Sequence, residues 1–99
     1  MKEFISIQEA LNKGKGEVSV RGWAHRERGS NKLKFIVLRD SSNIIQCVIK
    51  PENKFWDEAQ KVTVESSVEI TGTIKADERA PTGFELQVTD LKLIGSSDS

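Results

Sequence analysis

The amino-acid sequence predicts an all-β domain with short helices: a five-stranded barrel with one helix at its N-terminus and a second between the third and fourth strands. Three observations predict this fold. Five segments alternate apolar and polar residues with the period of a β-strand, one segment between the third and fourth has helical spacing, and a glycine interrupts a long first strand. The chain has 99 residues, 36% hydrophobic and 30% charged, which is the size of one small domain.

The N-terminal segment is predicted to form a short helix over residues 7–13. Ser6 and Glu9 have the spacing of a capping box, in which each side chain satisfies a free N–H group at the start of a helix. Gly14 and Gly16 end the pattern, because glycine favours the turn that terminates a helix.

The next elements are three strands and a helix. The first strand begins at Val18, and Gly22 within it predicts a bulge or bend that re-phases the residues beyond. The second strand spans residues 33–39 and the third spans 44–49, joined by turns rich in Gly, Ser, Asn and Asp. Residues 55–62 then carry apolar side chains at i, i+4 and i+7, which predicts a helix.

Two further strands complete the chain. The fourth, residues 68–75, has the clearest alternation of apolar and polar residues. After a loop over residues 76–83, the fifth strand begins at Phe84 and continues past a phase slip near Asp90.

This order of elements is that of the OB barrel, a five-stranded Greek-key barrel that often binds oligonucleotides. An SH3-like barrel fits less well, because it does not usually place a full helix between its third and fourth strands. We expect the domain to span residues 1–94. Residues 95–99 have the composition of a linker, which we interpret as the start of a connection to a further domain.

The charge is segregated along the chain although the formal net charge is zero. Between Lys13 and Arg39 there are eight basic and two acidic residues, whereas the segment from Asp40 to Ser99 has six basic and eleven acidic ones. A local basic surface attracts phosphates more effectively than the global sum indicates. The distribution is therefore compatible with a nucleic-acid partner, although ordinary solvated strand faces remain the alternative.

Several kinds of site are disfavoured by the composition. Cys47 is the only cysteine and His25 the only histidine, so neither an internal disulfide nor a zinc site is expected. We interpret Cys47, Trp23 and Trp56 as packing residues. The longest apolar runs are far shorter than the roughly 20 residues that span a bilayer. With no secretory leader recognised, we expect a soluble, cytoplasmic protein with no membrane partner.

An OB barrel binds nucleic acid mainly on its second and third strands and the adjacent loops. Phe35 has the parity opposite to Ile36 and Leu38, so we expect its ring to face outward, where a base can stack on it. Gln46 interrupts an apolar strand, and its amide can pair with the edge of a base. Arg26 and Arg28 lie near the end of the first strand, together with His25, and can bind phosphate. Core packing for the ring and solvation for the polar groups are the alternatives.

Several segments together resemble a known family, the N-terminal anticodon-binding domain of the aspartyl, asparaginyl and lysyl class II tRNA synthetases. The resemblance covers the chain from about Val18 to Ile94. Within this family the chain looks most like the asparaginyl enzymes, and the aspartyl enzymes are the alternative. The segments that carry the resemblance are Val20 to Arg26, Lys34 to Asp40, Ile44 to Gln46, Glu65 to Val68 and Ala80 to Glu85.

The resemblance implies roles for individual residues. The phenylalanine at the position of Phe35 stacks on the middle anticodon uridine, and the glutamine at Gln46 hydrogen-bonds that base. The arginine matched by Arg28, and less closely by Arg26, supports the anticodon loop. The glutamate matched by Glu85 contacts the first anticodon base. The resemblance leaves the reader of the third base open, and the two candidates are Lys75 and Arg79.

The resemblance also implies partners. The expected partner is a tRNA anticodon loop, that of tRNA-Asn in particular. The family's catalytic motifs, which bind ATP and Mg²⁺, do not occur in this sequence, so we expect no cofactor in this domain and no aminoacylation by the 99-residue chain alone. We expect the isolated domain to be a monomer and the full-length enzyme to be a homodimer.

Two other functions remain open. An OB barrel also occurs as a free-standing protein that binds single-stranded nucleic acid without sequence preference, and as a module for protein interaction. The gene sequence beyond Ser99 would separate these functions from the synthetase domain.

Overall fold

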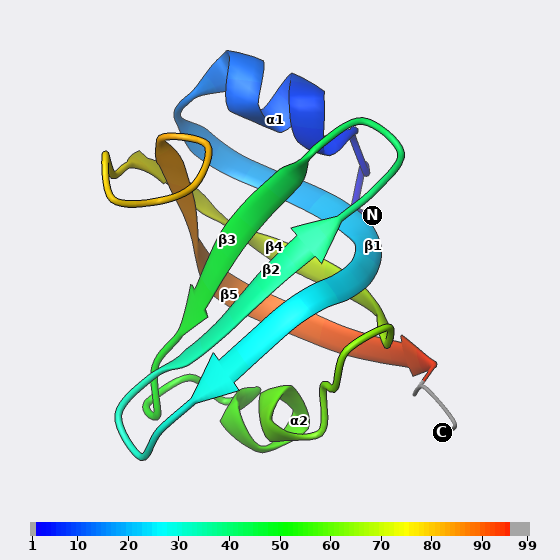
Figure 1. The fold of residues 1–99 in the computed structure, drawn as a ribbon, viewed down its shortest axis with the longest axis vertical. Coiled ribbons are helices and arrows are strands. Elements are labelled where there is room, and N and C mark those ends of the chain that lie inside the picture. The colour runs from blue at the N-terminus through cyan, green and yellow to red at the C-terminus, as the bar shows by residue number, and fades with distance from the viewer. Residues whose placement is uncertain (1, 96–99) are drawn as a thin grey trace.

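The computed structural model describes residues 2–95 as a closed barrel of five strands in the order β1-β2-β3-β5-β4 (Figure 1). This confirms the predicted fold class. All neighbouring strands are antiparallel except β3 and β5, which pair in parallel and close the barrel. The elements are α1 (Ile7–Lys13), β1 (Gly16–Gly29), β2 (Lys34–Arg39), β3 (Ile44–Ile49), α2 (Trp56–Gln60), β4 (Ser67–Ala76) and β5 (Phe84–Gly95).

The two helices lie at opposite ends of the barrel (Figure 1). At the start of α1, the Ser6 hydroxyl accepts a hydrogen bond from the Glu9 N–H, as the capping box predicted, and Gly14 ends the helix in the left-handed conformation with φ 66°. The Asp40 carboxylate accepts a hydrogen bond of 2.8 Å from the Ile7 N–H, which fastens α1 to the turn between β2 and β3. α1 is thereby fixed to the barrel by both packing and hydrogen bonds.

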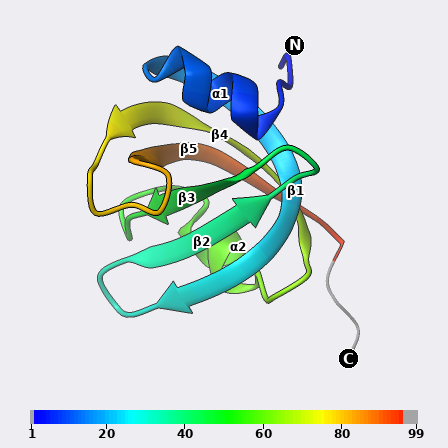
Figure 2. The same ribbon diagram turned by 45° about the horizontal axis from the view of Figure 1, so that its top comes forward.

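Strand β1 is long enough to belong to two sides of the barrel, and Figure 2 shows how it curves around. Its first half pairs with β4 and its second half with β2, and Trp23 is in register with residues of both. The sequence predicted a bulge or a bend at Gly22; the bulge lies instead at His25, where the register with β2 shifts between Ala24 and Arg26. A Cβ atom at Gly22 would lie 2.1 Å from the Arg39 carbonyl oxygen, so glycine is required there by the close approach of two backbones.

The core follows the alternation of the strands. Inward residues of all five strands are buried, and both helices add apolar side chains. Strand β5 changes phase at Thr89, where the register with β4 shifts, next to the predicted position at Asp90. α2 is shorter than the predicted segment, but Val62 beyond its end is fully buried.

Three residues interpreted as packing residues differ in their surroundings. Cys47 is fully buried, and burial raises the pKa of its thiol well above its usual value. Trp56 packs against the core. Trp23, in contrast, is 44% exposed and lies on the outside of the barrel with the Arg39 guanidinium 6.0 Å from its ring centroid. Trp23 therefore packs on the outer surface of the barrel and not in its core.

Only the first residue of the predicted linker, Gly95, lies within the described structure. Gly95 is the last residue of β5 and is in register with Ser67 of β4. The rest of the predicted linker, residues 96–99, lies outside the described residues.

Candidate nucleic-acid interface

The outward face of β2 carries the aromatic residue of the candidate site. Ile36 and Leu38 are fully buried, whereas Phe35 and Val37 are half-buried on the opposite face of the strand. The predicted parity of β2 is therefore confirmed. The ring of Phe35 is covered on one side by the guanidinium of Arg28, 5.1 Å from the ring centroid.

A row of paired residues runs around the barrel beside Phe35. Arg26 of β1 is in register with Val37, Val37 with Gln46 of β3, and Gln46 with Glu85 of β5. Glu85 is in turn in register with Lys75 of β4. Because paired residues of adjacent strands point to the same side, these side chains all face outward in succession. Lys75 lies two strands away from Gln46, about 10 Å along the row.

Four of the seven predicted site residues line one groove of about 540 Å³. The sequence did not single out the walls of this groove, because Val64 and Pro81 belong to loops whose position depends on the closed barrel. Val37, in contrast, could have been predicted to line the groove, because it has the same parity as Phe35 in the second strand. The residues lining the groove are Arg26, Glu27, Arg28, Phe35, Val37, Gln46, Val64 and Pro81.

Glu85 lies at the edge of this arrangement. It is half-buried, and the amide of Gln87 donates a hydrogen bond of 3.4 Å to its carboxylate. Gln87 is not among the site residues predicted from the sequence. In the structure it holds the orientation of the acid next to Gln46, with which Glu85 is in register.

Arg79 does not line the groove. Its side chain is 90% exposed and forms an ion pair of 3.4 Å with Asp77. A hydrogen bond from the Arg79 backbone N–H is the main cause that lowers the pKa of Asp77, and the side chain and charge of Arg79 add to it. The loop itself is closed by a hydrogen bond from the Asp77 N–H to the Gly83 carbonyl, which brings Pro81 of the same loop to the groove.

The basic surface is smaller than the sequence indicates. Lys34, one of the eight basic residues between Lys13 and Arg39, is only 4% exposed. Its ammonium group donates a hydrogen bond of 2.6 Å to the Glu27 carboxylate. Lys34 is therefore not available to bind phosphate.

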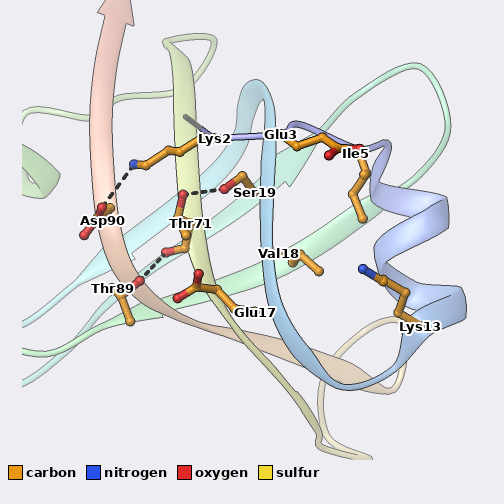
Figure 3. A pocket seen from close by; sticks show the side chains of 10 residues that line it. All are labelled: Lys2, Glu3, Ile5, Lys13, Glu17, Val18, Ser19, Thr71, Thr89 and Asp90. Carbon is orange, nitrogen blue, oxygen red and sulfur yellow. Dashed lines mark hydrogen bonds and ion pairs between the residues drawn. The ribbon is translucent and has the colours of Figure 1, made fainter.

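A second hollow of similar size lies elsewhere on the barrel, beside β1, β4 and β5 (Figure 3). The Ser19 and Thr71 hydroxyl groups are hydrogen-bonded to each other at 2.7 Å, and Lys2 pairs with Asp90 at 3.1 Å. Because these polar groups satisfy one another, we assign no ligand to this hollow. Among residues 2–95 no cluster of His, Cys, Asp or Glu is arranged to hold a metal ion, and no helix is long and apolar enough to cross a membrane.

Comparison with known proteins relates this geometry to a family. Residues 18–94 match the tRNA anti-codon family of OB-fold nucleic acid binding domains. The chain is 49% identical over 83 residues to an asparagine–tRNA ligase of Thermococcus gammatolerans, and 40% identical over 101 residues to that of Thermoplasma acidophilum. These matches cover 82% and 96% of this chain but only 19% and 23% of the relatives, so the chain spans about a fifth of their length.

Solved structures show the same relationship. The asparaginyl-tRNA synthetase from Pyrococcus horikoshii, complexed with asparaginyl-adenylate, superimposes with a TM-score of 0.87 at 33% identity. That match covers 99% of this chain and 24% of the synthetase. An aspartyl tRNA synthetase from Entamoeba histolytica has a TM-score of 0.85 at 23% identity, over 99% of this chain and 22% of that one, and shows the shared fold.

Proposed function

We propose that this chain, which belongs to the tRNA anti-codon family of OB-fold nucleic acid binding domains, is the anticodon-binding module of an asparagine–tRNA ligase. Support comes from the curated relatives and the Pyrococcus horikoshii structure, together with one observation on this molecule. That observation is the groove in which Arg28, Phe35 and Gln46 meet. It combines a cation, an aromatic ring and an amide, which are the groups that hold and read an unstacked base.

Each of these groups has a separate task in the proposed function. The Phe35 ring stacks on the middle base of the anticodon, a contact that any base can make. The Gln46 amide forms hydrogen bonds with the edge of that base and so selects uridine. Arg26 and Arg28 bind the phosphates of the loop, which strengthens binding without selecting a sequence.

The remaining bases are assigned by position. Glu85 lies next to Gln46 in register and contacts the first base of the anticodon. Lys75 lies one strand further, in register with Glu85, and is the better placed candidate for the third base. Arg79 is the less well placed candidate, because its 90% exposed side chain lies outside the groove and its Nε atom pairs with Asp77.

The reaction itself belongs to the part of the ligase that this chain does not contain. We propose that ATP and Mg²⁺ are used there, that the module alone is an inactive monomer, and that the complete enzyme is a cytoplasmic homodimer. The module contributes by holding the anticodon loop, so that the acceptor end of the same tRNA is presented to the catalytic part.

Binding of RNA stem-loops to the purified chain tests the proposal. We expect a stem-loop with a G-U-U anticodon to bind more tightly than one with a substituted middle base, by about fivefold or more, since a lost base-pairing contact costs about 1 kcal/mol. A G-U-C loop distinguishes the asparagine anticodon from the aspartate anticodon. Equal binding of all loops would contradict anticodon reading and indicate a protein that binds single strands without preference.

A further inference from the structure

Lys34 is the only charged residue that the fold buries among residues 2–95. Its ammonium group donates to the Glu27 carboxylate at 2.6 Å and to the Val62 carbonyl oxygen at 3.3 Å. Gly29 lies opposite Lys34 in the β1–β2 register, and a Cβ atom there would be 3.1 Å from the Lys34 Cδ atom. The absence of a side chain at Gly29 leaves room for the stem of the lysine. The side chain of Lys34 therefore packs closely between β1 and the segment after α2, and its ammonium group is hydrogen-bonded to both.

The partner of this lysine lies in the groove. Glu27 comes between Arg26 and Arg28 in the sequence, and all three residues line the groove. Its side chain is 32% exposed. An unpaired carboxylate at this place would repel the phosphates of a bound RNA. It would also lower the positive electrostatic potential that Arg26 and Arg28 create in the groove. The same lysine also holds the Val62 carbonyl, two residues before the groove wall at Val64.

We propose that Lys34 is a positioning residue for RNA binding: it neutralises Glu27 and holds its carboxylate back from the RNA. This inference rests on the proposed function, because it assigns the groove to RNA. It accounts for the burial of a lysine at the edge of a basic surface, where an exposed lysine would contact phosphate directly. The charge of Lys34 thus acts on the RNA through Glu27 and not by direct contact.

A double-mutant cycle tests this role. The parent, K34M, E27Q and K34M/E27Q are compared for binding to the G-U-U stem-loop and to a loop with a substituted middle base. K34M keeps the apolar stem and removes the charge, so it should weaken binding to both loops by about threefold to tenfold at low salt. The loss should shrink as salt rises, because salt screens the exposed carboxylate. In K34M/E27Q, binding should return to within about twofold of the parent.

K32M provides the matched control, because Lys32 is an exposed lysine of the β1–β2 connection, two residues before Lys34. Its effect on binding should be the same whether residue 27 is Glu or Gln. A K34M loss that E27Q does not restore, or K34M binding equal to the parent, would overturn the proposal. If K34M does not fold, the test uses K34M/E27Q, which has no unpaired charge at this place. A tenfold loss of its affinity for the stem-loops, relative to the parent, would overturn the proposal.

Comparing the G-U-U stem-loop with the substituted loop separates a failure of the proposed function from a failure of the role proposed for Lys34. If the parent binds both loops equally, anticodon reading fails, and the rescue by E27Q still tests Lys34. If the parent binds neither loop, both proposals fail.

Discussion

The guanidinium of Arg28 lies over the ring of Phe35, with 5.1 Å between its central carbon and the ring centroid, and the two residues face each other in the β1–β2 register. A phenyl ring on the outside of a small barrel is thus partly covered by a cation. A base that enters the groove either takes the place of this cation on the ring or stacks on the planar guanidinium. In the proposed function, this pair is the surface on which the middle base of the anticodon stacks.

Phe35→Ala should remove this surface. We expect a loss of about 1–3 kcal/mol in binding to a stem-loop, whatever the middle base, because every base has a face that stacks. Binding titrations with loops that carry each middle base measure the loss. The thermal midpoint should stay near that of the parent. Ile36→Ala, which empties a fully buried position on the other face of β2, should cost about 2–5 kcal/mol of stability. Unfolding of Phe35→Ala to the same extent would show that Phe35 is a core residue.

Gln46→Ala should act on selectivity. With uridine in the middle position we expect a loss of about 1 kcal/mol, since a hydrogen bond to the base is removed. With a substituted middle base the loss should be smaller, because that base does not make the matched hydrogen bond. The difference between the two losses, measured by titration at one salt concentration, is the test. An equal loss for both loops would assign Gln46 to packing or to the backbone of the RNA.

Binding should weaken steeply as salt rises, because phosphate contacts release counterions. Arg26→Ala and Arg28→Ala should each reduce the slope of log K against log salt by about 0.7, the value for one contact to a single strand. Arg21→Ala is the control: its guanidinium lies over the Phe4 ring at 4.8 Å and does not line the groove. Identical slopes for all three variants and the parent would argue against phosphate contacts by Arg26 and Arg28.

Gly22→Ala should destabilise the barrel by about 1–3 kcal/mol, because the new methyl group would collide with the Arg39 carbonyl and force two strands apart. Gly95→Ala is the control. There the new Cβ atom would lie 3.4 Å from the Ser67 Oγ atom, which is an ordinary contact, and we expect a change within about 0.5 kcal/mol. Urea denaturation of both variants measures the difference. Equal stability of both would show that β1 can move away from β2 at this point.

Asp40 should make part of the stability dependent on pH. Burial raises the pKa of this carboxyl, but hydrogen bonds from the Ser42 hydroxyl and from three backbone N–H groups, including that of Ile7, outweigh burial and hold the pKa below its usual value. Because the folded pKa is lower than the unfolded one, this stabilisation is present above about pH 4 and is lost as the pH falls through the folded pKa.

Asp40→Asn should therefore be less stable than the parent at pH 7, by about 1–2 kcal/mol, since hydrogen bonds to a charged group are lost. The difference between variant and parent should decrease below pH 4. Denaturation curves at several pH values give this difference, with Glu52→Gln, a change of an exposed acid, as the control. A constant difference over the whole pH range would contradict the role of the Asp40 charge.

The sequence by itself determined the order of the elements and the direction of most side chains. Alternation and helical spacing are local patterns, and they depend only on which residues have to leave water. For this reason the outward position of Phe35 and Gln46 and the capping of α1 by Ser6 were predictable from the residues alone. Phosphate binding by Arg26 and Arg28 was predicted from the chemistry of the guanidinium and from resemblance to a family, whereas the role of Glu85 was predicted from that resemblance alone.

Only the tertiary structure decided what each side chain meets. The burial of Lys34 beside Glu27, the exposure of Trp23 and the bulge at His25 depend on how distant strands pair when the barrel closes. The same closure brings Val64 and Pro81 to the groove. Such contacts join residues far apart in the chain and leave no periodic signal in it, because the period of a strand specifies its faces and not its neighbours.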